Sequence, residues 1–447
     1  ESGGGCRIVP AEGIAGTKRI TITLLPNLTG AVRTVTVYIR SGEAERRLIL
    51  TQHSADVRPC SEEEVRRFLE RLYRDTDGDN WRFRENWCTD KPLSEWGSSV
   101  KYEGGKLSLI LGENGLHGKI DLSGCTALVS LRCAKNSGLT AIDVTDCPLL
   151  TELDCTSCGL SELKFDGDYS LRRILCGYNA LTALDLSPCP CLTELHAPHN
   201  RLEMLNVARC AELENLNCGE NNLTALGVTE RPSLVYLFCY GNRLSELDLT
   251  GCPNLYLVNC GENRLTNLAL SGCKKLKRLY CYDNLLPELD LSDFSSVLTE
   301  LYCPGNRLTT LNVAGSRSLS HLVCSRNELE RLDLTGCKML SVLECARNDL
   351  YSITLSGCEM LGRLDCSDNR LESVDVSECR YLTGFVCNHN RICSEIPETF
   401  DRLTVFEYDV RYSYRTETTT GGGAVVHTDR GVGWWYPGEP GKGFHDR

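Results

Sequence analysis

The stretch LECARNDLYSITLSGCEMLGRLDCSDNRL, residues 343–371, contains the same motif twice. Each copy reads L-x-C-x-x-N-x-L, and the segment between the copies carries the pattern L-S-G-C. Outward from this stretch, the motif recurs every 21 or 22 residues between about Leu107 and Ile392, which makes fourteen units. Its asparagine stands at positions 114, 136, 179, 200, 221, 242, 263, 284, 306, 327, 348, 369 and 390, and Cys158 fills the remaining slot. A fixed period of about this length predicts a stacked repeat architecture.

The columns of the repeat have physical roles in such a stack. One unit cannot bury its own leucine face, but a pile of units makes a continuous core, so the leucines are expected to point inward. The asparagine lies where the chain bends out of a strand, and its side-chain amide can satisfy backbone groups that no neighbouring strand reaches. Fourteen strands at about 4.8 Å spacing give a sheet roughly 60 Å long, and so large a surface favours binding over small-molecule chemistry.

Cysteine accounts for 27 residues, and 21 of them fall into two columns of the repeat. The first column holds Cys133, Cys155, Cys176, Cys218, Cys239, Cys260, Cys281, Cys303, Cys324, Cys345, Cys366 and Cys387. The second holds Cys125, Cys147, Cys189, Cys210, Cys252, Cys273, Cys337, Cys358 and Cys379. These cysteines are either metal or redox groups, or small apolar packing units of the core. We favour the core, because Leu111 and Ala197 replace cysteine in the first column. Neighbouring Cβ atoms about 4.8 Å apart also exceed the roughly 3.8 Å that a disulfide prefers.

These repeats resemble the leucine-rich repeat, and a cysteine ladder in 21-residue units is similar to internalin J-like bacterial surface adhesins. The resemblance covers the repeat region, 107–392. It implies an α/β-type leucine-rich repeat solenoid, mostly parallel β with short or irregular convex segments, whose strands line a concave face.

The region 58–106 predicts an N-terminal cap. Ser61 and Glu64 form a capping box, and the helical spacing of the apolar residues after it predicts a helix over 61–76. Those apolar residues are Val65, Phe68, Leu69, Leu72 and Tyr73. Trp81, Trp87 and Trp96 follow, and the segment resembles the cap before plant-type and many bacterial leucine-rich repeats, in which Trp residues cover the first coil.

Two other features of the cap are ambiguous. Asp75, Asp77 and Asp79 suggest a calcium loop, but Gly78 is fourth in it, whereas an EF-hand-like loop needs glycine sixth and a late glutamate, so we expect no metal. Cys60 and Cys88 flank the helix, and a disulfide between them is left open. The other cysteines outside the two columns have no evident partner: Cys6, Cys158, Cys191 and Cys393.

Residues 1–57 alternate apolar and polar residues over 20–23, 34–39 and 48–50, with turn-forming residues between these runs, which predicts antiparallel β structure. The runs 33–37 and 48–52 resemble the later strands of a BACON domain, an immunoglobulin-like module for which glycan or mucin binding has been proposed. The earlier strands of that module are missing, so the match is partial. A spacer that holds the solenoid off a surface is the alternative.

The C-terminal part, 393–447, leaves the repeat pattern. Residues 405–410 and 411–414 are expected to form edge strands that close the last coil. Trp434 and Trp435 are either part of a cap core or an exposed contact, and we favour the cap. Some 55 residues are too few for a separate catalytic domain.

Aromatic residues cluster in the outward-facing strand slots of four consecutive turns. The slots beside the inward leucine and cysteine point out on the concave face. Aromatic rings anchor interfaces because they are large and cost little entropy to order, and they stack on sugar rings. Their general suitability for strands is the alternative explanation. We interpret the cluster, called the aromatic patch below, as a ligand-binding site: Tyr236, Phe238, Tyr240, Tyr280, Tyr282 and Tyr302.

Composition and motifs exclude several functions. The net charge is −12, which argues against nucleic acid or anionic lipid as the main partner. No run of about 18 apolar residues is present, so no transmembrane helix is expected. His196 and His199 lack a carboxylate partner at fixed spacing, and no H-E-x-x-H, G-x-S-x-G or P-loop motif occurs. We therefore expect no catalytic residues, no metal, no cofactor and no enzyme activity.

The favoured function is that of a secreted or cell-surface bacterial binding or adhesion protein, which uses its concave face to hold a protein or glycan, with a host ligand among the candidates. The alternative is a structural or scaffolding surface lipoprotein with a bacterial partner. We expect a monomer that is extracellular or at the cell surface, including as an outer-membrane lipoprotein. Any membrane contact would come through a lipid anchor outside this chain. The sequence begins at Glu1 without an initiator Met or signal peptide, which we interpret as a mature or trimmed form.

Overall fold

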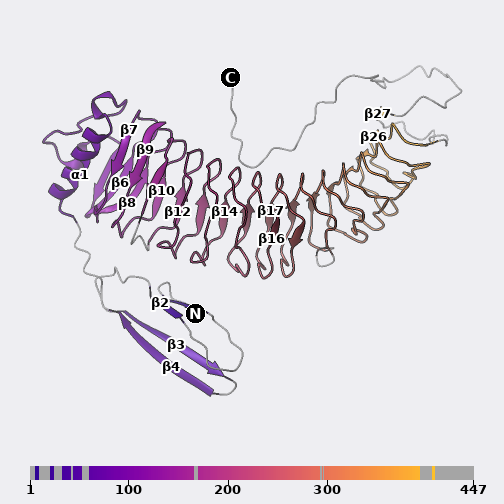
Figure 1. The fold of residues 1–447 in the computed structure, drawn as a ribbon, viewed down its shortest axis with the longest axis horizontal. Coiled ribbons are helices and arrows are strands. Elements are labelled where there is room, and N and C mark those ends of the chain that lie inside the picture. The colour runs from indigo at the N-terminus through magenta and orange to yellow at the C-terminus, as the bar shows by residue number, and fades with distance from the viewer. Residues whose placement is uncertain are drawn as a thin grey trace. The chain divides into compact units, whose positions relative to one another are not determined.

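The computed structural model describes residues 60–165, 170–291, 294 and 296–392, the backbone of five strands nearer the two ends of the chain, and the side chains of residues 48–50. The fold is a parallel β-solenoid of about 13 turns with little helix, as the repeat predicts. The chain divides into two compact units, Glu1–Leu286 and Pro287–Arg447. The turns of each unit follow one another in chain order (Figure 1).

In the first unit, a long sheet contributes one strand per turn and is parallel except at its start, where β5 and β6 are antiparallel. Its strands, in spatial order, are β5 (Val100–Glu103), β6 (Lys106–Ile110), β8 (Leu128–Arg132), β10 (Glu152–Asp154), β12 (Arg173–Leu175), β13 (Glu194–His196), β14 (Asn215–Asn217), β15 (Tyr236–Phe238), β17 (Leu257–Asn259) and β19 (Arg278–Tyr280). On the other side of the turns, short parallel sheets form from β7 (His117–Asp121), β9 (Gly138–Asp143) and β11 (Glu162–Lys164), and from β16 (Glu246–Asp248) and β18 (Asn267–Ala269).

The second unit repeats this arrangement. Its long sheet contains β20 (Glu300–Tyr302), β21 (His321–Val323), β23 (Val342–Glu344), β25 (Arg363–Asp365), β26 (Gly384–Val386) and β27 (Val405–Glu407), and a side sheet pairs β22 (Arg331–Asp333) with β24 (Ser352–Thr354). Strand β27 pairs in parallel with β26, so it extends the sheet beyond the last repeat as the sequence predicts. The rest of the expected edge strands and Trp434–Trp435 lie outside the described residues.

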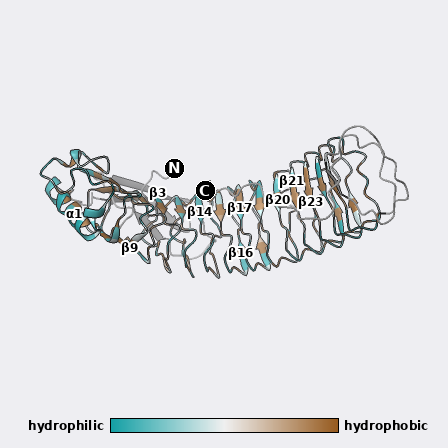
Figure 2. Ribbon diagram, turned by 90° about the horizontal axis from the view of Figure 1, so that it is seen from above, coloured by the Kyte–Doolittle hydropathy of each residue, from teal (hydrophilic) through white to brown (hydrophobic). Residues whose placement is uncertain are grey.

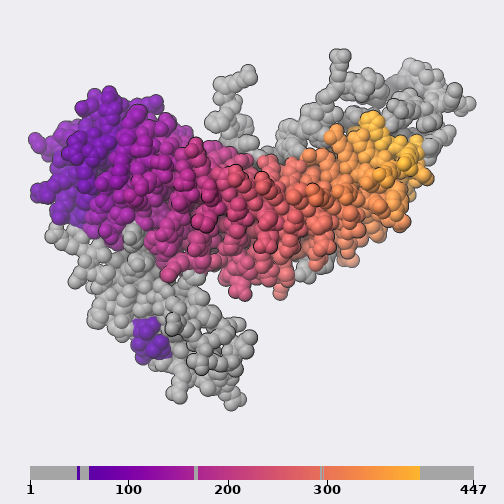
Figure 3. Space-filling view, in the orientation of Figure 1, coloured from indigo at the N-terminus to yellow at the C-terminus, as the bar shows by residue number. Residues whose placement is uncertain are grey.

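The inward residues form the core of each turn. The central leucine of a strand, such as Leu216 or Leu237, is fully buried, and the column cysteines that the structure describes are buried too. Neighbouring turns are in direct contact in the space-filling view (Figure 3). A buried leucine contributes about 1.5–3 kcal/mol, so each turn gains its stability from the turns on either side of it.

The asparagine column has the predicted role. Asn221, for example, donates from Nδ2 to the carbonyl oxygens of Ala197 and Cys218 at 2.9 and 3.1 Å, and its Oδ1 accepts from the backbone N of Leu202 at 3.0 Å. One amide therefore satisfies carbonyls of its own turn and of the previous turn. At the slot where Cys158 replaces the asparagine, the thiol takes over the donor role of the amide: its Sγ donates to the Cys133 carbonyl at 3.0 Å.

The two cysteine columns differ in a way that the sequence does not reveal. Thiols of the second column donate to the backbone of the previous turn, as Cys252 does to the Val228 carbonyl at 3.1 Å and Cys337 to the Val313 carbonyl at 3.2 Å. In the first column, Cys239 is fully buried, and among the residues that the structure describes its Sγ donates no hydrogen bond. The description of both columns as apolar packing units is therefore incomplete.

This difference predicts that replacement by serine destabilises the protein much less in the second column than in the first. Cys252→Ser keeps a donor near the Val228 carbonyl and should change the free energy of unfolding by less than about 1 kcal/mol. Cys239→Ser buries a hydroxyl without a partner and should cost about 2 kcal/mol. Urea unfolding of the two variants at pH 7 measures both values. Equal losses would contradict the assignment of the two columns.

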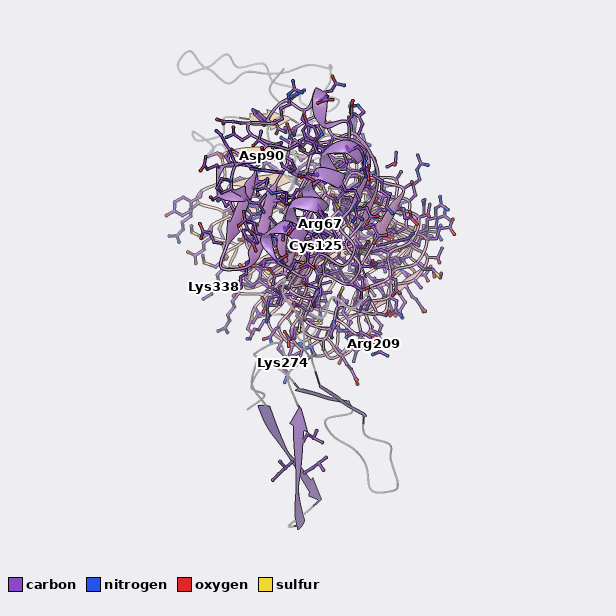
Figure 4. The ribbon with its side chains drawn as sticks, turned by 90° about the vertical axis from the view of Figure 1, so that its left-hand side faces the viewer. Arg67, Asp90, Cys125, Arg209, Lys274 and Lys338 are labelled. Atoms are coloured by element: carbon purple, nitrogen blue, oxygen red, sulfur yellow. The ribbon has the colours of Figure 1, made fainter. Side chains whose placement is uncertain are left out.

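The helix predicted over 61–76 is present in the structure. Helix α1 (Glu62–Asp75) begins at Ser61, whose side chain forms the capping box with Glu64. Figure 2 shows hydrophilic and hydrophobic stretches side by side on α1, and its buried residues are Val65, Leu69 and Leu72. Arg67 on α1 and Cys125 of the first turn both lie at this end of the unit (Figure 4). Two short 3-10 helices follow, η1 (Gly78–Asn80) and η2 (Leu93–Glu95).

The tryptophans of the cap form one buried cluster. Trp81, Trp87 and Trp96 are at most 5% exposed, with ring centroids 4.8 Å apart for the first pair and 5.5 Å for the second. Each indole nitrogen donates a hydrogen bond, such as that of Trp81 to the Thr76 carbonyl at 2.9 Å. Cys60 and Cys88 are both free thiols, so the disulfide left open by the sequence is not formed.

The N-terminal region contains the antiparallel strands that the sequence predicts. Strand β1 (Cys6–Val9) pairs with β2 (Thr21–Leu24), and β3 (Arg33–Ser41) pairs with β4 (Ala44–Gln52). The likeness to a BACON module stays a prediction.

Candidate ligand-binding site on the long sheet

Strands β14, β15, β17 and β19 carry the centre of the candidate site. The middle residue of each strand is buried, and the residues on either side of it are at least partly exposed, except Leu257 on β17, which is buried. The parallel register aligns Asn217 with Phe238, Phe238 with Asn259, and Asn259 with Tyr280. These four half-buried side chains form one row across the sheet, called the central row below.

Tyr236 is the most open member of the aromatic patch, with 39% of its surface exposed. Its ring meets Tyr256 edge to face, with centroids 6.1 Å apart, and Lys277 Nζ lies 5.6 Å from the centroid of the Tyr256 ring. The outward strand slots do not include Tyr256, which stands one residue before β17, so spacing alone does not place it in the site.

Tyr240 and Tyr282 have a packing role that spacing alone does not show. A Cβ built on Gly219 would lie 2.6 Å from Cε1 of Tyr240, and one on Gly261 would lie 2.4 Å from Cε1 of Tyr282. Each tyrosine ring therefore covers a glycine of the previous turn, and only glycine leaves room for it. These two residues hold adjacent turns together as well as facing the candidate site.

Tyr302 is the sixth predicted residue, and it belongs to the second unit. It ends strand β20, is half-buried, and pairs in register with Val323. The structure thus brings five residues of the aromatic patch together in the first unit.

Turns β8 to β13 carry charged residues in the same slots. Glu152 forms salt bridges with Arg132 at 2.7 Å and with Arg173 at 3.1 Å. Arg173 also forms one with Glu194, from Nε at 2.9 Å. Burial raises the pKa of Glu152, but the hydrogen bond and charge of Arg132, together with Arg173, outweigh it and hold this pKa below its ordinary value. An ionic row therefore precedes the central row on the same sheet.

The two histidines that the sequence singles out occupy different environments. His196 lies on β13 with Nε2 3.3 Å from a Glu194 carboxylate oxygen, a neighbour that the sequence spacing does not predict, but within the described residues this Nε2 makes no hydrogen bond. Burial lowers the pKa of His196, and Glu194 only partly opposes this. His199 lies in the following loop with φ 51° and stacks on Tyr178 at a centroid distance of 4.3 Å. Neither arrangement includes a nucleophile.

Burial also determines the chemistry of the column cysteines. It raises the pKa of Cys176 and Cys324 to about 12, so both stay protonated and unreactive at neutral pH. Among the residues that the structure describes, no group of three or more His, Cys, Asp or Glu side chains is placed to hold a metal ion. In the same residues, no helix has the length and apolar character needed to cross a membrane.

Comparison with known proteins supports the fold assignment. No family model and no curated protein matches the sequence. YopM from Yersinia enterocolitica is 25% identical, with 67% of each chain covered and a TM-score of 0.53. An internalin, InlF from Listeria monocytogenes, is 16% identical, with 68% of this chain and 87% of its own covered and a TM-score of 0.50. The functional domain of InlJ from Listeria monocytogenes, which includes a cysteine ladder, is 22% identical over 75% and 76% of the two chains, but its TM-score is only 0.41. The chain thus shares the leucine-rich repeat fold of such proteins.

Proposed function

We propose that this chain is a secreted or cell-surface bacterial binding protein that holds a protein or glycan ligand on the long sheet of its first unit. The observation that supports this best is the aromatic patch, where Tyr236 and Phe238 on one turn and Tyr280 two turns further along the sheet remain partly exposed. Aromatic residues in the middle of a large surface are typical binding anchors. A leucine-rich repeat sheet also offers the extended surface that such a ligand needs.

The proposal predicts that the aromatic patch carries most of the affinity. The triple variant Tyr236→Ala, Phe238→Ala and Tyr280→Ala should weaken ligand binding by about a hundredfold or more, since anchor residues contribute about 2 kcal/mol or more each. The measurement is binding of both forms to an array of mucin glycans and extracellular matrix proteins. Tyr240 and Tyr282 are left intact, because they pack on glycines of the previous turn.

The matched control removes equally large side chains away from the long sheet. Met339, Met360 and Tyr381 are 54%, 44% and 58% exposed, and they occupy one column of the loops in the second unit. Their replacement by Ala should leave the array signal unchanged. If the patch variant and the control bind like the parent chain, the ligand lies elsewhere, and absence of any signal would favour a structural role.

A further inference from the structure

Two successive pairs of turns in the first unit repeat the same arrangement. In the first turn of each pair, an asparagine ends the strand and a glycine follows two residues later. In the second turn, an aromatic residue ends the strand and a tyrosine follows two residues later. The two copies are Asn217 and Gly219 with Phe238 and Tyr240, then Asn259 and Gly261 with Tyr280 and Tyr282.

Both asparagine side chains are oriented by the same backbone contact. Asn217 Oδ1 accepts from the Gly219 N–H at 3.1 Å, and Asn259 Oδ1 accepts from the Gly261 N–H at 3.2 Å. The tyrosine of the next turn then covers that glycine. Within the described residues, neither Nδ2 group donates a hydrogen bond, so each copy presents an amide donor on the sheet face.

The central row therefore alternates an amide donor with an aromatic ring, and it contains no charged residue. In two other turns, the residue that ends the strand is charged and has no donor. Asp154 on β10 and Asp365 on β25 make the same backbone contact, to the N–H of Thr156 and of Ser367, but a carboxylate has no donor to offer. The chemistry of the row fits a neutral ligand that is rich in acceptors and has flat apolar surfaces.

The spacing of the two copies selects among such ligands. They lie two strands apart, about 9.6 Å. A polyproline II helix repeats every three residues, about 9.3 Å, and has no internal hydrogen bonds, so its carbonyls are open acceptors. An extended strand repeats on one face at about 6.6 Å. Proline residues also have no N–H and present rings that pack on aromatic side chains.

We propose that the central row binds a proline-rich, polyproline II segment of a protein partner, one turn of the ligand per copy. In this arrangement Asn217 and Asn259 donate to ligand carbonyls one turn apart, and Phe238 and Tyr280 pack against proline rings. The inference rests on the proposed function and narrows its ligand to a protein of this chemistry.

The test uses the whole chain and a fluorescent peptide of twelve prolines. The parent should bind it with a Kd below about 1 mM, and a Gly/Ser peptide of equal length should not bind. The double variant Asn217→Asp and Asn259→Asp keeps the backbone contact, as Asp154 and Asp365 show, but removes both donors. It should weaken peptide binding by about tenfold or more with an unchanged melting temperature. Phe238→Leu with Tyr280→Leu should do the same.

Asp154→Asn is the matched control, because it adds a donor at a turn whose neighbours are Arg132 and Leu175 instead of aromatic residues. It should leave peptide binding unchanged. Absence of peptide binding by the parent would overturn the inference, and so would equal binding by the Asn-to-Asp double variant. Binding of a neutral oligosaccharide such as cellohexaose in place of the peptide would overturn it in favour of a sugar ligand.

The outcome is separable from that of the proposed function. If an array ligand binds through the aromatic patch but is not displaced by the proline peptide, the proposed function is supported and this inference is wrong. If neither the array nor the peptide gives a signal that depends on the patch, both fail.

Discussion

Raising the pH from 8 to 10 is expected to unfold this protein, because its buried thiols ionise only in the unfolded chain. Burial raises the pKa from 9.0 to about 12 at seven cysteines: Cys125, Cys176, Cys218, Cys260, Cys273, Cys324 and Cys358. A thiol with a raised folded-state pKa binds its proton more tightly in the folded state. Its contribution to stability is fully present below pH 9 and is lost as the pH rises from about 9 toward 12.

The size of this loss follows from linkage. At pH 10 each such thiol lowers the free energy of unfolding by about 1.4 kcal/mol relative to pH 8, and the seven together by about 10 kcal/mol. That sum is comparable with the whole stability of a typical domain, about 5–15 kcal/mol. Circular dichroism across pH 7 to 11 should show cooperative loss of the sheet signal, with the midpoint at or below about pH 10.

A single substitution isolates the thiol contribution from other titrating groups. Cys324 is fully buried, and burial is the one cause of its raised pKa. Cys324→Ala fits the column, since Ala197 occupies the same slot in another turn. The stability difference between parent and variant, measured in urea, should shrink by about 1.4 kcal/mol between pH 8 and pH 10. A difference that does not change with pH would show that this thiol does not couple folding to ionisation.

Replacing one asparagine of the column is expected to cost about 3 kcal/mol, the largest effect of any single side chain discussed above. In Asn221→Ala, the buried Leu202 N–H is left without its acceptor, whereas the Ala197 and Cys218 carbonyls each lose one donor and keep another, from Asn200 and Asn242. Each buried group left without a partner costs about 1–3 kcal/mol. The free energy of unfolding in urea at pH 7 measures the loss.

The neighbouring residue supplies the control. Asn222 is half-buried, its side chain makes no hydrogen bond in the structure, and its backbone N–H bonds the Leu202 carbonyl at 2.9 Å. Asn222→Ala keeps that bond and should change stability by less than about 0.5 kcal/mol. Similar costs for the two variants would mean that the amide ladder does not stabilise the turns as argued.

The sequence predicted the features that every turn must share. A residue that recurs at one position of a stack meets the same environment in each turn, so its type reports that environment. For this reason the buried leucines, the hydrogen-bonding role of the asparagines and the solenoid itself followed from periodicity. The cap helix followed from a local contact between Ser61 and Glu64, four consecutive residues whose geometry depends little on the rest of the fold.

The candidate site was only partly predictable. Periodicity placed Tyr236, Phe238 and Tyr280 in outward slots, and the register confirms those slots. It did not identify Tyr256 beside Tyr236 or Glu194 beside His196. Both contacts depend on the direction that a side chain takes, which spacing does not specify.

By itself, then, the amino-acid sequence determined the repeat, the inward columns and the set of outward residues, because each of these depends on position within one turn. Only the tertiary structure decided which side chains meet across turns. It placed Tyr240 over Gly219, aimed the second-column thiols at carbonyls of the previous turn, and left the amide donors of Asn217 and Asn259 without partners. The physical reason is that contacts between turns depend on rotamers and close packing, which form only when one turn is stacked on another.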